Sequence, residues 1–296
     1  MALSLKKARL EADFLAALRF ESSKVKADPA HWHSHIGGLI FDRYMFGSGA
    51  SDFFDYGYLV MENDECVGFL SVEASQNSAA IDISLSDDKK EYYRDIILSV
   101  LNALGKSKRV RINANIRDKK LLDALDSLRF IKGNESRAQY VFDLKNTDTP
   151  LPVWENESIA KLTLDDLEER AYHSALATSQ RISSKMYKAL MDSPYYKNAV
   201  DLVVRDNESG QMAGYIGFWF DENSLTALVE PAASIKEFRR RGIMKKALLH
   251  GIFLMRQKGL DFIYVSTEGD NTPARKLYES VGFKRYGRVF EYYINL

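Results

Sequence analysis

The feature that most constrains the fold of this chain is an internal repeat, spaced by about 150 residues, the size of an ordinary domain. Residues 58–72 show an apolar run, a turn rich in Asn, Asp and Glu, and a second apolar run, which is the pattern of a β-hairpin. Residues 202–218 repeat that pattern, and Gly214 has the place that Gly68 has in the first copy.

A second match lies near the end of each half. Residues 125–130 (Leu-Asp-Ser-Leu-Arg-Phe) correspond to residues 278–283 (Tyr-Glu-Ser-Val-Gly-Phe), and in both copies a helical pattern ends and an aromatic residue begins an extended segment. Hairpins and helix ends are common in α/β proteins, but two matches in the same order favour duplication. The sequence therefore predicts two copies of a unit that can fold alone.

Length and composition agree with two cores. The chain has 296 residues, of which 46% are hydrophobic and 28% charged, an ordinary composition for a globular protein. A polar stretch over residues 145–152 carries two of the six prolines and marks the boundary. We expect one domain over residues 1–148 and a second over residues 149–296.

Charge and cysteine content exclude some classes of protein. Lys+Arg and Asp+Glu both number 41, so the net charge of zero argues against nucleic-acid binding. The single Cys66 cannot form an internal disulfide, which fits a reducing compartment. No apolar run approaches the ~20 residues of a membrane span, and the N-terminus is typical of an amphipathic helix with Leu10, Phe14 and Leu18 on one face. We expect a cytoplasmic protein that does not bind membranes.

The second half contains a strand–helix–strand pattern. Residues 225–229 form a short apolar run, residues 240–258 have helical periodicity, and residues 261–266 form the next strand. Gly259 stands where a left-handed helix cap belongs. Short joints between these segments predict a βαβ unit.

The loop that opens this helix, Arg239-Arg-Arg-Gly242-Ile-Met-Lys245-Lys246, has the chemistry of a pyrophosphate site. The first turn of a helix presents backbone N–H groups without internal acceptors, at the positive end of the helix dipole. Gly242 lets an anion approach the chain, while arginine and lysine add charged donors. Cations at this end of a helix are unfavourable unless an anion binds there.

The helix near the C-terminus has clear boundaries. Thr272 is expected to cap it, Pro273 to occupy its first position and Gly282 to end it. Asn271 would then lie in the preceding loop, free to hydrogen-bond a ligand.

Together these segments resemble the GNAT superfamily of N-acetyltransferases. The resemblance rests on Arg239-x-x-Gly242 at a helix start, followed by Asn271-x-x-Ala-x-x-Leu-Tyr278-x-x-x-Gly282-Phe. It implies a mixed α/β sheet flanked by helices in each of two tandem domains, with acetyl-CoA as acyl donor and no metal. The cofactor residues it implies are Ser234, Ile235, Arg239, Arg240, Arg241, Gly242, Ile243, Met244, Lys245 and Asn271.

The first half resembles a degenerate GNAT copy. Residues 85–94, where a second loop would lie, contain no glycine and mix acids with bases, and Arg129 replaces Gly282. The whole chain resembles tandem GNAT proteins of the mycothiol-synthase-like arrangement. The resemblance implies that only the second domain binds acetyl-CoA, while the first helps to shape the acceptor pocket.

The resemblance also implies direct acetyl transfer to a primary amine. Such a reaction needs a base for the ammonium and an acid for the departing thiolate. Tyr278 is the expected acid, although it could instead be a core aromatic. Glu230 is the expected base, with Glu268 as the alternative; either could be a solvated strand end.

Several other segments favour structural interpretations. Histidines at 31, 33 and 35 alternate as metal ligands can, but no acid or cysteine completes a site, so a polar loop is favoured. The run 218–220 (Phe-Trp-Phe) is expected in the core. Residues 159–177 read as one helix whose acids face solvent.

Three functions fit this pattern. The first is an N-acetyltransferase for a small-molecule or peptide amine. The second is a non-catalytic acyl-CoA sensor, favoured by Met244, because the family keeps a small residue there. The third, an aminoacyl transferase using charged tRNA, is disfavoured by the basic loop and the zero net charge.

Overall fold

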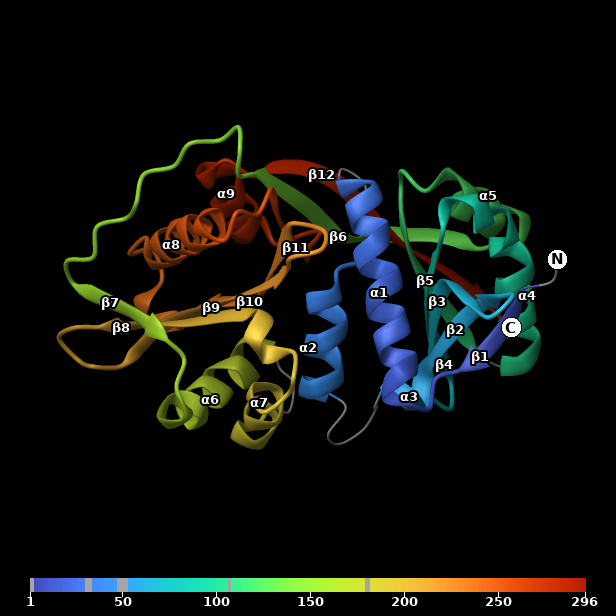
Figure 1. Cartoon of the computed structure of the whole chain (residues 1–296), viewed down its shortest axis with the longest axis horizontal. Coiled ribbons are helices and arrows are strands. Elements are labelled where there is room, and N and C mark those ends of the chain that lie inside the picture. The colour runs from blue at the N-terminus through green and yellow to red at the C-terminus, as the bar shows by residue number, and fades with distance from the viewer. Residues whose placement is uncertain (1–2, 30–33, 47–52, 106–107, 179–181) are drawn as a thin grey trace.

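The computed structural model describes residues 3–29, 34–46, 53–105, 108–178 and 182–296. Its strands form one twelve-stranded mixed sheet that runs through both halves, in the order β1-β2-β3-β4-β5-β12-β6-β11-β10-β9-β8-β7 (Figure 1). The strands are β1 (Ser4–Lys7), β2 (Gly57–Glu62), β3 (Glu65–Ala74), β4 (Ser78–Leu85), β5 (Arg109–Asn115), β6 (Ile131–Asp143), β7 (Glu157–Lys161), β8 (Ala199–Asp206), β9 (Met212–Asp221), β10 (Thr226–Ser234), β11 (Phe262–Glu268) and β12 (Lys284–Asn295).

Helices cover both faces of this sheet. They are α1 (Glu11–Ala27), α2 (Ile36–Phe46), α3 (Phe53–Tyr56), α4 (Tyr93–Leu104), α5 (Lys119–Ser127), α6 (Leu167–Thr178), α7 (Ser184–Met191), α8 (Ile243–Gln257) and α9 (Thr272–Val281). None of them, in the described part of the chain, is long and apolar enough to cross a membrane.

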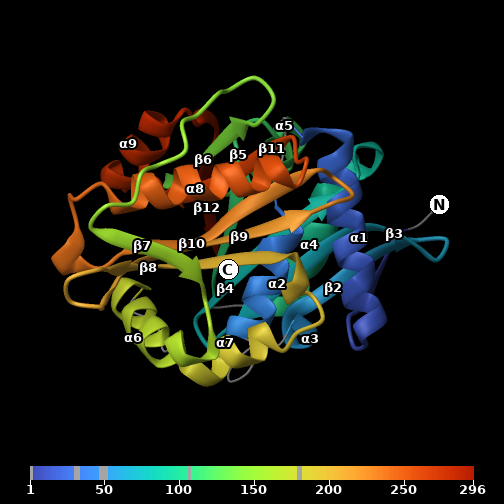
Figure 2. The same ribbon diagram turned by 60° about the vertical axis from the view of Figure 1, so that its left-hand side comes forward.

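Alternating side chains assign each helix to a face. In β9, Phe218 points at α8, since a Cβ on Gly251 would meet its ring, whereas Trp219 points at α2, where it faces Gly37. Figure 2 shows α8 on one side of β9 and β10, and α6 and α7 on the other. Helices α1 and α2 lie between the two halves (Figure 1), on the face shared with α6 and α7.

The repeat predicted from the sequence is visible in the hydrogen bonds. The amide of Ser86 donates to the carbonyl that precedes Gly68, and the amide of Ile235 donates to the carbonyl that precedes Gly214 (2.9 and 3.0 Å). Helix α5 ends with the Phe130 amide bonded to the Leu125 carbonyl, and α9 ends with the Phe283 amide bonded to the Tyr278 carbonyl. The chain thus contains two tandem units with matching local geometry.

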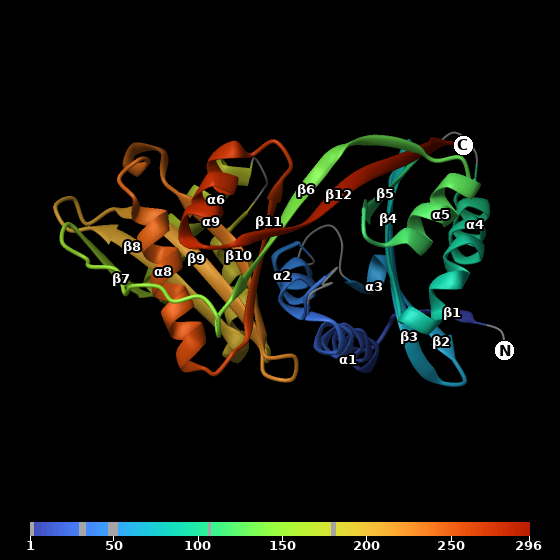
Figure 3. The same ribbon diagram turned by 90° about the horizontal axis from the view of Figure 1, so that it is seen from above.

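The two halves exchange sheet edges. Strand β12 of the second half pairs with two strands of the first half, β5 on one side and β6 on the other. Strand β6 in turn pairs with β11 of the second half. Figure 3 shows β6 and β12 running side by side from one half to the other. Helix α2, from the first half, packs on β9, β10 and α7.

Two expected helices begin later than the pattern suggested. Residues 4–7 form strand β1 against β2, and residues 157–161 form strand β7 against β8, so the helices start at Glu11 and Leu167. In both places a sheet edge takes up residues whose own pattern is compatible with a helix. The expected solvent-facing acids of the second helix are also wrong in part, because Asp166 is 7% exposed and bonded to Arg205.

Candidate active site

The loop before α8 leaves backbone donors free. Helical bonding begins with the Lys246 amide donating to the Gly242 carbonyl, so the amides of the first turn, from Ile243 to Lys245, have no acceptor in the helix. Gly242 caps the helix with φ of +78°, and a Cβ built there would meet nothing within 4 Å. Arg240 also has a positive φ, of +65°. The loop therefore has open space in front of unpaired amides, as an anion site requires.

The basic side chains of the loop divide into anchored and free groups. Arg239 Nε donates to the Ser234 carbonyl (3.3 Å), and Arg241 pairs with Asp206 (3.2 Å). Arg240 and Lys245 are exposed and form no ion pair with any residue that the structure describes. Those two cations remain available to an anion, whereas Arg241, although predicted as a ligand, also anchors the loop.

Met244 does not obstruct the loop. Its side chain is partly buried against the core, and its sulfur would lie 3.2 Å from a Cβ on Gly214. The absence of a side chain at Gly214 makes room for the methionine. Ile243 is 2% exposed, so it can contribute only its amide to a ligand.

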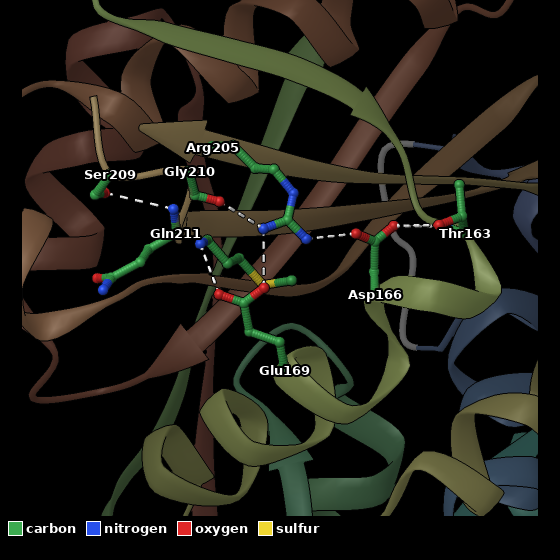
Figure 4. Close-up of polar contacts among 8 residues, drawn as sticks. Thr163, Asp166, Glu169, Arg205, Ser209, Gly210 and Gln211 are labelled. Carbon is green, nitrogen blue, oxygen red and sulfur yellow. Dashed lines mark hydrogen bonds and ion pairs between the residues drawn. The ribbon is translucent and has the colours of Figure 1, made fainter. Parts of the chain in front are cut away.

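A polar network supports the hairpin to which Arg241 is anchored. Arg205 binds Asp166 (2.5 Å), Glu169 (2.9 Å) and the Gly210 carbonyl (2.9 Å), as Figure 4 shows. Glu169 also accepts a bond from the Met212 amide (2.7 Å). The network joins α6 to the β8–β9 hairpin and so fixes the position of Asp206.

Strands β10 and β11 separate beside this loop. They pair in parallel only from Thr226–Phe262 to Leu228–Tyr264, and the later residues of both strands diverge. The register of β10 with β9 shifts between Val229 and Ala232, where Glu230 lies. The two strands therefore leave a V-shaped split between them.

The structure places Ser234 and Ile235 at the end of β10, next to the loop. The amide of Ile235 is already bonded to the Ala213 carbonyl, and the Ser234 carbonyl accepts from Arg239. These two backbone groups therefore support the loop itself.

A cavity of about 840 Å³ opens on the face of α1 and α2, at the split and between the halves. Its wall includes the predicted Glu230, Glu268 and Asn271. Six carboxylates line it, namely Glu21, Asp42, Glu73, Asp82, Glu230 and Glu268. One guanidinium, that of Arg137, lies among them.

Burial and mutual repulsion change the proton affinity of these acids. Burial raises the pKa of Glu230, partly offset by Arg137. Burial in the cavity, with repulsion from Glu230 and other acids, raises the pKa of Asp42 to about 7, although its side chain is solvent-accessible inside the cavity. A Glu230 with a raised pKa is a better proton acceptor than an ordinary glutamate.

Tyr278 is buried, 7% exposed, with its ring 5.7 Å from that of Tyr140, and it is not among the residues that line the cavity. Burial and then the charge of Glu230 raise its pKa, so the phenol keeps its proton at neutral pH. Tyr278 and Glu230 are therefore close enough to interact electrostatically.

The cap of α9 differs from the expected one. Asn271, not Thr272, caps the helix, with its Oδ1 accepting from the Ala274 amide (3.2 Å). The expectation that Asn271 is entirely free is wrong, because an asparagine is a better cap than a threonine. Its side-chain amide still lines the cavity.

Of the three alternating histidines, only His35 belongs to the described part of the chain. His31 and His33 lie outside the described residues. His35 is buried, accepts a bond from the Gly37 amide and contacts Thr226 Oγ1 (3.1 Å), and burial lowers its pKa to about 4. No group of three metal-ligating side chains occurs among the described residues.

The matching loop of the first half is differently built. Residues 87–92 form a 3-10 turn before α4, where Lys89 pairs with Glu62 (2.7 Å) and Lys90 with Asp87 (2.8 Å). Asp118 caps α5 as Asn271 caps α9. The lysines there are neutralised by neighbouring acids, in contrast to Arg240 and Lys245.

Sequence analysis expected the first half to help shape the acceptor pocket but identified none of its acidic residues there. Glu21, Asp42, Glu73 and Asp82 come from α1, α2, β3 and β4. No local motif marks them, because they meet only when α1 and α2 lie between the halves.

The sequence of the second half is similar to known acetyltransferases. Residues 159–283 match the model of the Acetyltransferase (GNAT) family. Two curated relatives are N-alpha-acetyltransferase 30 of Schizosaccharomyces pombe, 36% identical over 72 residues, and that of Saccharomyces cerevisiae, 34% identical over 85 residues. These matches cover 24% and 29% of this chain but less than half of the relatives, 48% and 41%.

Solved structures match over nearly the whole chain. A tandem GNAT protein from the clavulanic acid biosynthesis pathway has a TM-score of 0.67 at 10% identity, and each chain is covered to at least 98%. A GCN5-related N-acetyltransferase from Sphaerobacter thermophilus has a TM-score of 0.60 at 17% identity, covering 99% of this chain and 98% of its own. These likenesses concern the fold.

Proposed function

Since residues 159–283 match the model of the Acetyltransferase (GNAT) family, we propose that this chain is an N-acetyltransferase, which carries an acetyl group from acetyl-CoA to a primary amine. The observation that carries this proposal is the position of the α8 loop. Its free amides and cations lie at one end of the β10–β11 split, and the acidic cavity opens at the same split.

The residues of the loop fit the diphosphate of acetyl-CoA. The amides from Gly242 to Lys245 would receive its oxygens, with charge from Arg240 and Lys245. Arg239 and Arg241 would hold the loop in shape through Ser234 and Asp206. In this proposal residues 1–148 form the first domain and residues 149–296 form the second, which binds the donor. The two domains are joined by the pairing of β12 with β5 and β6.

When bound, the donor supplies a thioester whose acetyl carbon accepts the nitrogen of the amine as the C–S bond breaks. Glu230 takes the proton that the attacking nitrogen must lose, directly or through water. Tyr278, which keeps its proton at neutral pH, gives it to the departing sulfur. Glu268 lines the same cavity and is the alternative base.

A sensor that binds acyl-CoA without turnover is the competing function. Met244 was the feature in its favour, and its packing over Gly214 leaves the loop amides open, which weakens that argument. A cytoplasmic location, expected from the single cysteine, belongs to the same proposal.

The test combines binding and turnover on the full chain. Acetyl-CoA at 100 times its dissociation constant should stabilise the protein by about 2.7 kcal/mol, and CoA release should depend on an added amine. Binding without amine-dependent release would favour the sensor. Absence of binding would remove both functions.

A further inference from the structure

The cavity has an unusual charge for an amine site. Its wall carries six carboxylates against one guanidinium, and His35 in the wall is neutral because burial holds its pKa near 4. The reacting amine needs one of these acids as a base. Five remain without a function in acetyl transfer.

Glu21 gives the most direct indication of a missing cation. Glu21 is 1% exposed, and neither of its carboxylate oxygens has a hydrogen-bond partner among the residues that the structure describes. Lys24, on the same helix α1, interacts electrostatically with Glu21 but donates its hydrogen bond to Ser84 Oγ (2.6 Å). A buried carboxylate without partners costs several kcal/mol unless a cation pairs with it.

Neighbouring acids of the first half face the same space. Glu73 in β3 and Asp82 in β4 lie on adjacent antiparallel strands, diagonal to each other on one face, where Cβ atoms are roughly 7–8 Å apart. Burial in the cavity and the charge of Glu73 raise the pKa of Asp82, partly offset by Arg137, although the Asp82 side chain is solvent-accessible. The single guanidinium therefore compensates the repulsion between these acids only in part.

Apart from Asp42 in α2, the acids form two groups. Glu230 and Glu268 end the strands that flank the split, where the acetyl group would be delivered. Glu21, Glu73 and Asp82 belong to the first half. The nitrogen that is acetylated loses its charge and becomes an amide, so it cannot neutralise the second group, and a separate ammonium is required there.

We propose that the acceptor is a small amine with at least two ammonium groups, of the diamine or polyamine class. One nitrogen is acetylated near Glu230, and another is held by Glu21, Glu73 and Asp82. This inference rests on the proposed acetyltransferase function. A cavity of about 840 Å³ has the size of a small-molecule site rather than of a groove for a long peptide.

The similarity to N-alpha-acetyltransferases spans at most 85 residues of this chain in the two yeast relatives, so it does not assign their substrates to this chain. Four of the six carboxylates precede residue 148. The acceptor is set by the first half.

The experiment compares 1,4-diaminobutane with 1-aminobutane, which has the same chain and one charge fewer. We expect kcat/KM for CoA release from acetyl-CoA to be at least tenfold higher for the diamine. Equal values would overturn the inference while leaving the acetyltransferase function intact. Faster release with a peptide whose only amine is its amino terminus would do the same.

Two variants locate the second ammonium. Glu21→Gln should raise KM for the diamine about tenfold without changing the monoamine, and Glu73→Gln, on an exposed strand position, should act in the same direction. Glu91→Gln, an exposed acid that does not line the cavity, is the charge-matched control and should retain the preference. A preference unchanged in both cavity variants contradicts the assignment.

Calorimetry with 1,4-diaminobutane in the presence of CoA separates the two proposals. Diamine binding that depends on Glu21, without any CoA release, would support the cation site and refute the acetyltransferase. Absence of diamine binding in the full chain would refute the cation site whatever the turnover with other amines.

Discussion

Backbone conformation at single residues shows where the repeat has kept its geometry and where it has changed. Gly282 ends α9 with φ of +111°, and Arg129 adopts +63° at the matching position, so the turn survives without glycine at a cost in strain. Gly242 differs, because its counterpart turn lacks the glycine, and a Cβ at Gly242 would meet nothing within 4 Å. The proposed function uses this free space for the donor as well as the glycine for the turn.

Replacing Gly242 with glutamate should abolish the stabilisation by acetyl-CoA. The change places a carboxylate and a Cβ in the space before the α8 amides, and the residue already has a φ that side chains disfavour. The measurement is the shift in melting temperature with acetyl-CoA. Gly259→Glu, at the other end of the same helix, has φ of +73° and equal free space, so it should cost similar stability but keep the shift. A retained shift in the Gly242 variant would move the donor site elsewhere.

Tyr278→Phe should lower kcat by about tenfold or more, with little change in acetyl-CoA affinity, because it removes one proton donor and no packing. Steady-state kinetics and calorimetry measure the two effects. Tyr140→Phe is the matched control, since that hydroxyl is occupied by Glu279 (2.9 Å) and Arg275 (3.3 Å). Equal kcat in wild type and Tyr278→Phe would remove the tyrosine from the mechanism.

His35 should make stability fall on acidification. Burial lowers its pKa to about 4, below the usual 6.5, so the unfolded chain binds more protons between these values. Its contribution is complete above pH 6.5 and is lost toward pH 4, by up to about 3 kcal/mol. Asp42 acts in the opposite direction, since its pKa is raised, so the measurement is the difference between wild type and His35→Gln in urea unfolding. Parallel pH curves for the two proteins would contradict this assignment.

At the scale of elements, hydrophobic periodicity predicted most helices and strands correctly. It failed where a segment with a helical pattern pairs with the edge of the sheet. Both hairpins, the βαβ unit and the helix end at Gly259 lie where the sequence predicted them. Residues 157–161 fit a helical pattern, yet they pair with β8, because an open edge strand supplies hydrogen bonds that no local pattern encodes. Among the acids that follow, Asp165 and Glu168 are exposed as expected, whereas Asp166 and Glu169 bind Arg205.

The network of Arg205 should therefore contribute measurably to stability. Arg205→Met leaves Asp166, which is 7% exposed, without its cation and should lower the free energy of unfolding by about 1–2 kcal/mol, a value reduced by the partial exposure of the arginine. Lys188→Met breaks the exposed pair with Asp192 and should cost less than about 0.5 kcal/mol. Urea unfolding measures both. Equal small effects would mean that the network does not brace the hairpin.

For the whole molecule, the loop at α8 could be predicted because its donors are consecutive in sequence, whereas the acidic cavity could not. Its wall is assembled from strands and helices of both halves, including α2, which belongs to the first half and packs on the second. The position of β12 between β5 and β6 likewise depends on contacts between the two halves. Neither arrangement follows from a pattern within one copy of the repeat.

Because β12 joins the halves, they should unfold together. Gly287 lies in β12 between β5 and β6, and a Cβ there would come within 2.6 Å of Gln139 Oε1 and 2.7 Å of Asn115 Nδ2. Gly287→Val should therefore force the strands apart and lower the free energy of unfolding by about 1–3 kcal/mol. The decisive readout is amide hydrogen exchange followed separately in β4 and β10, which lie in different halves and do not contact residue 287. Protection should fall in both strands by the same factor, in a single unfolding transition, since the one sheet is continuous only through β12. Loss of protection in one half alone, or two separated transitions, would show that each half is stable without the shared strand.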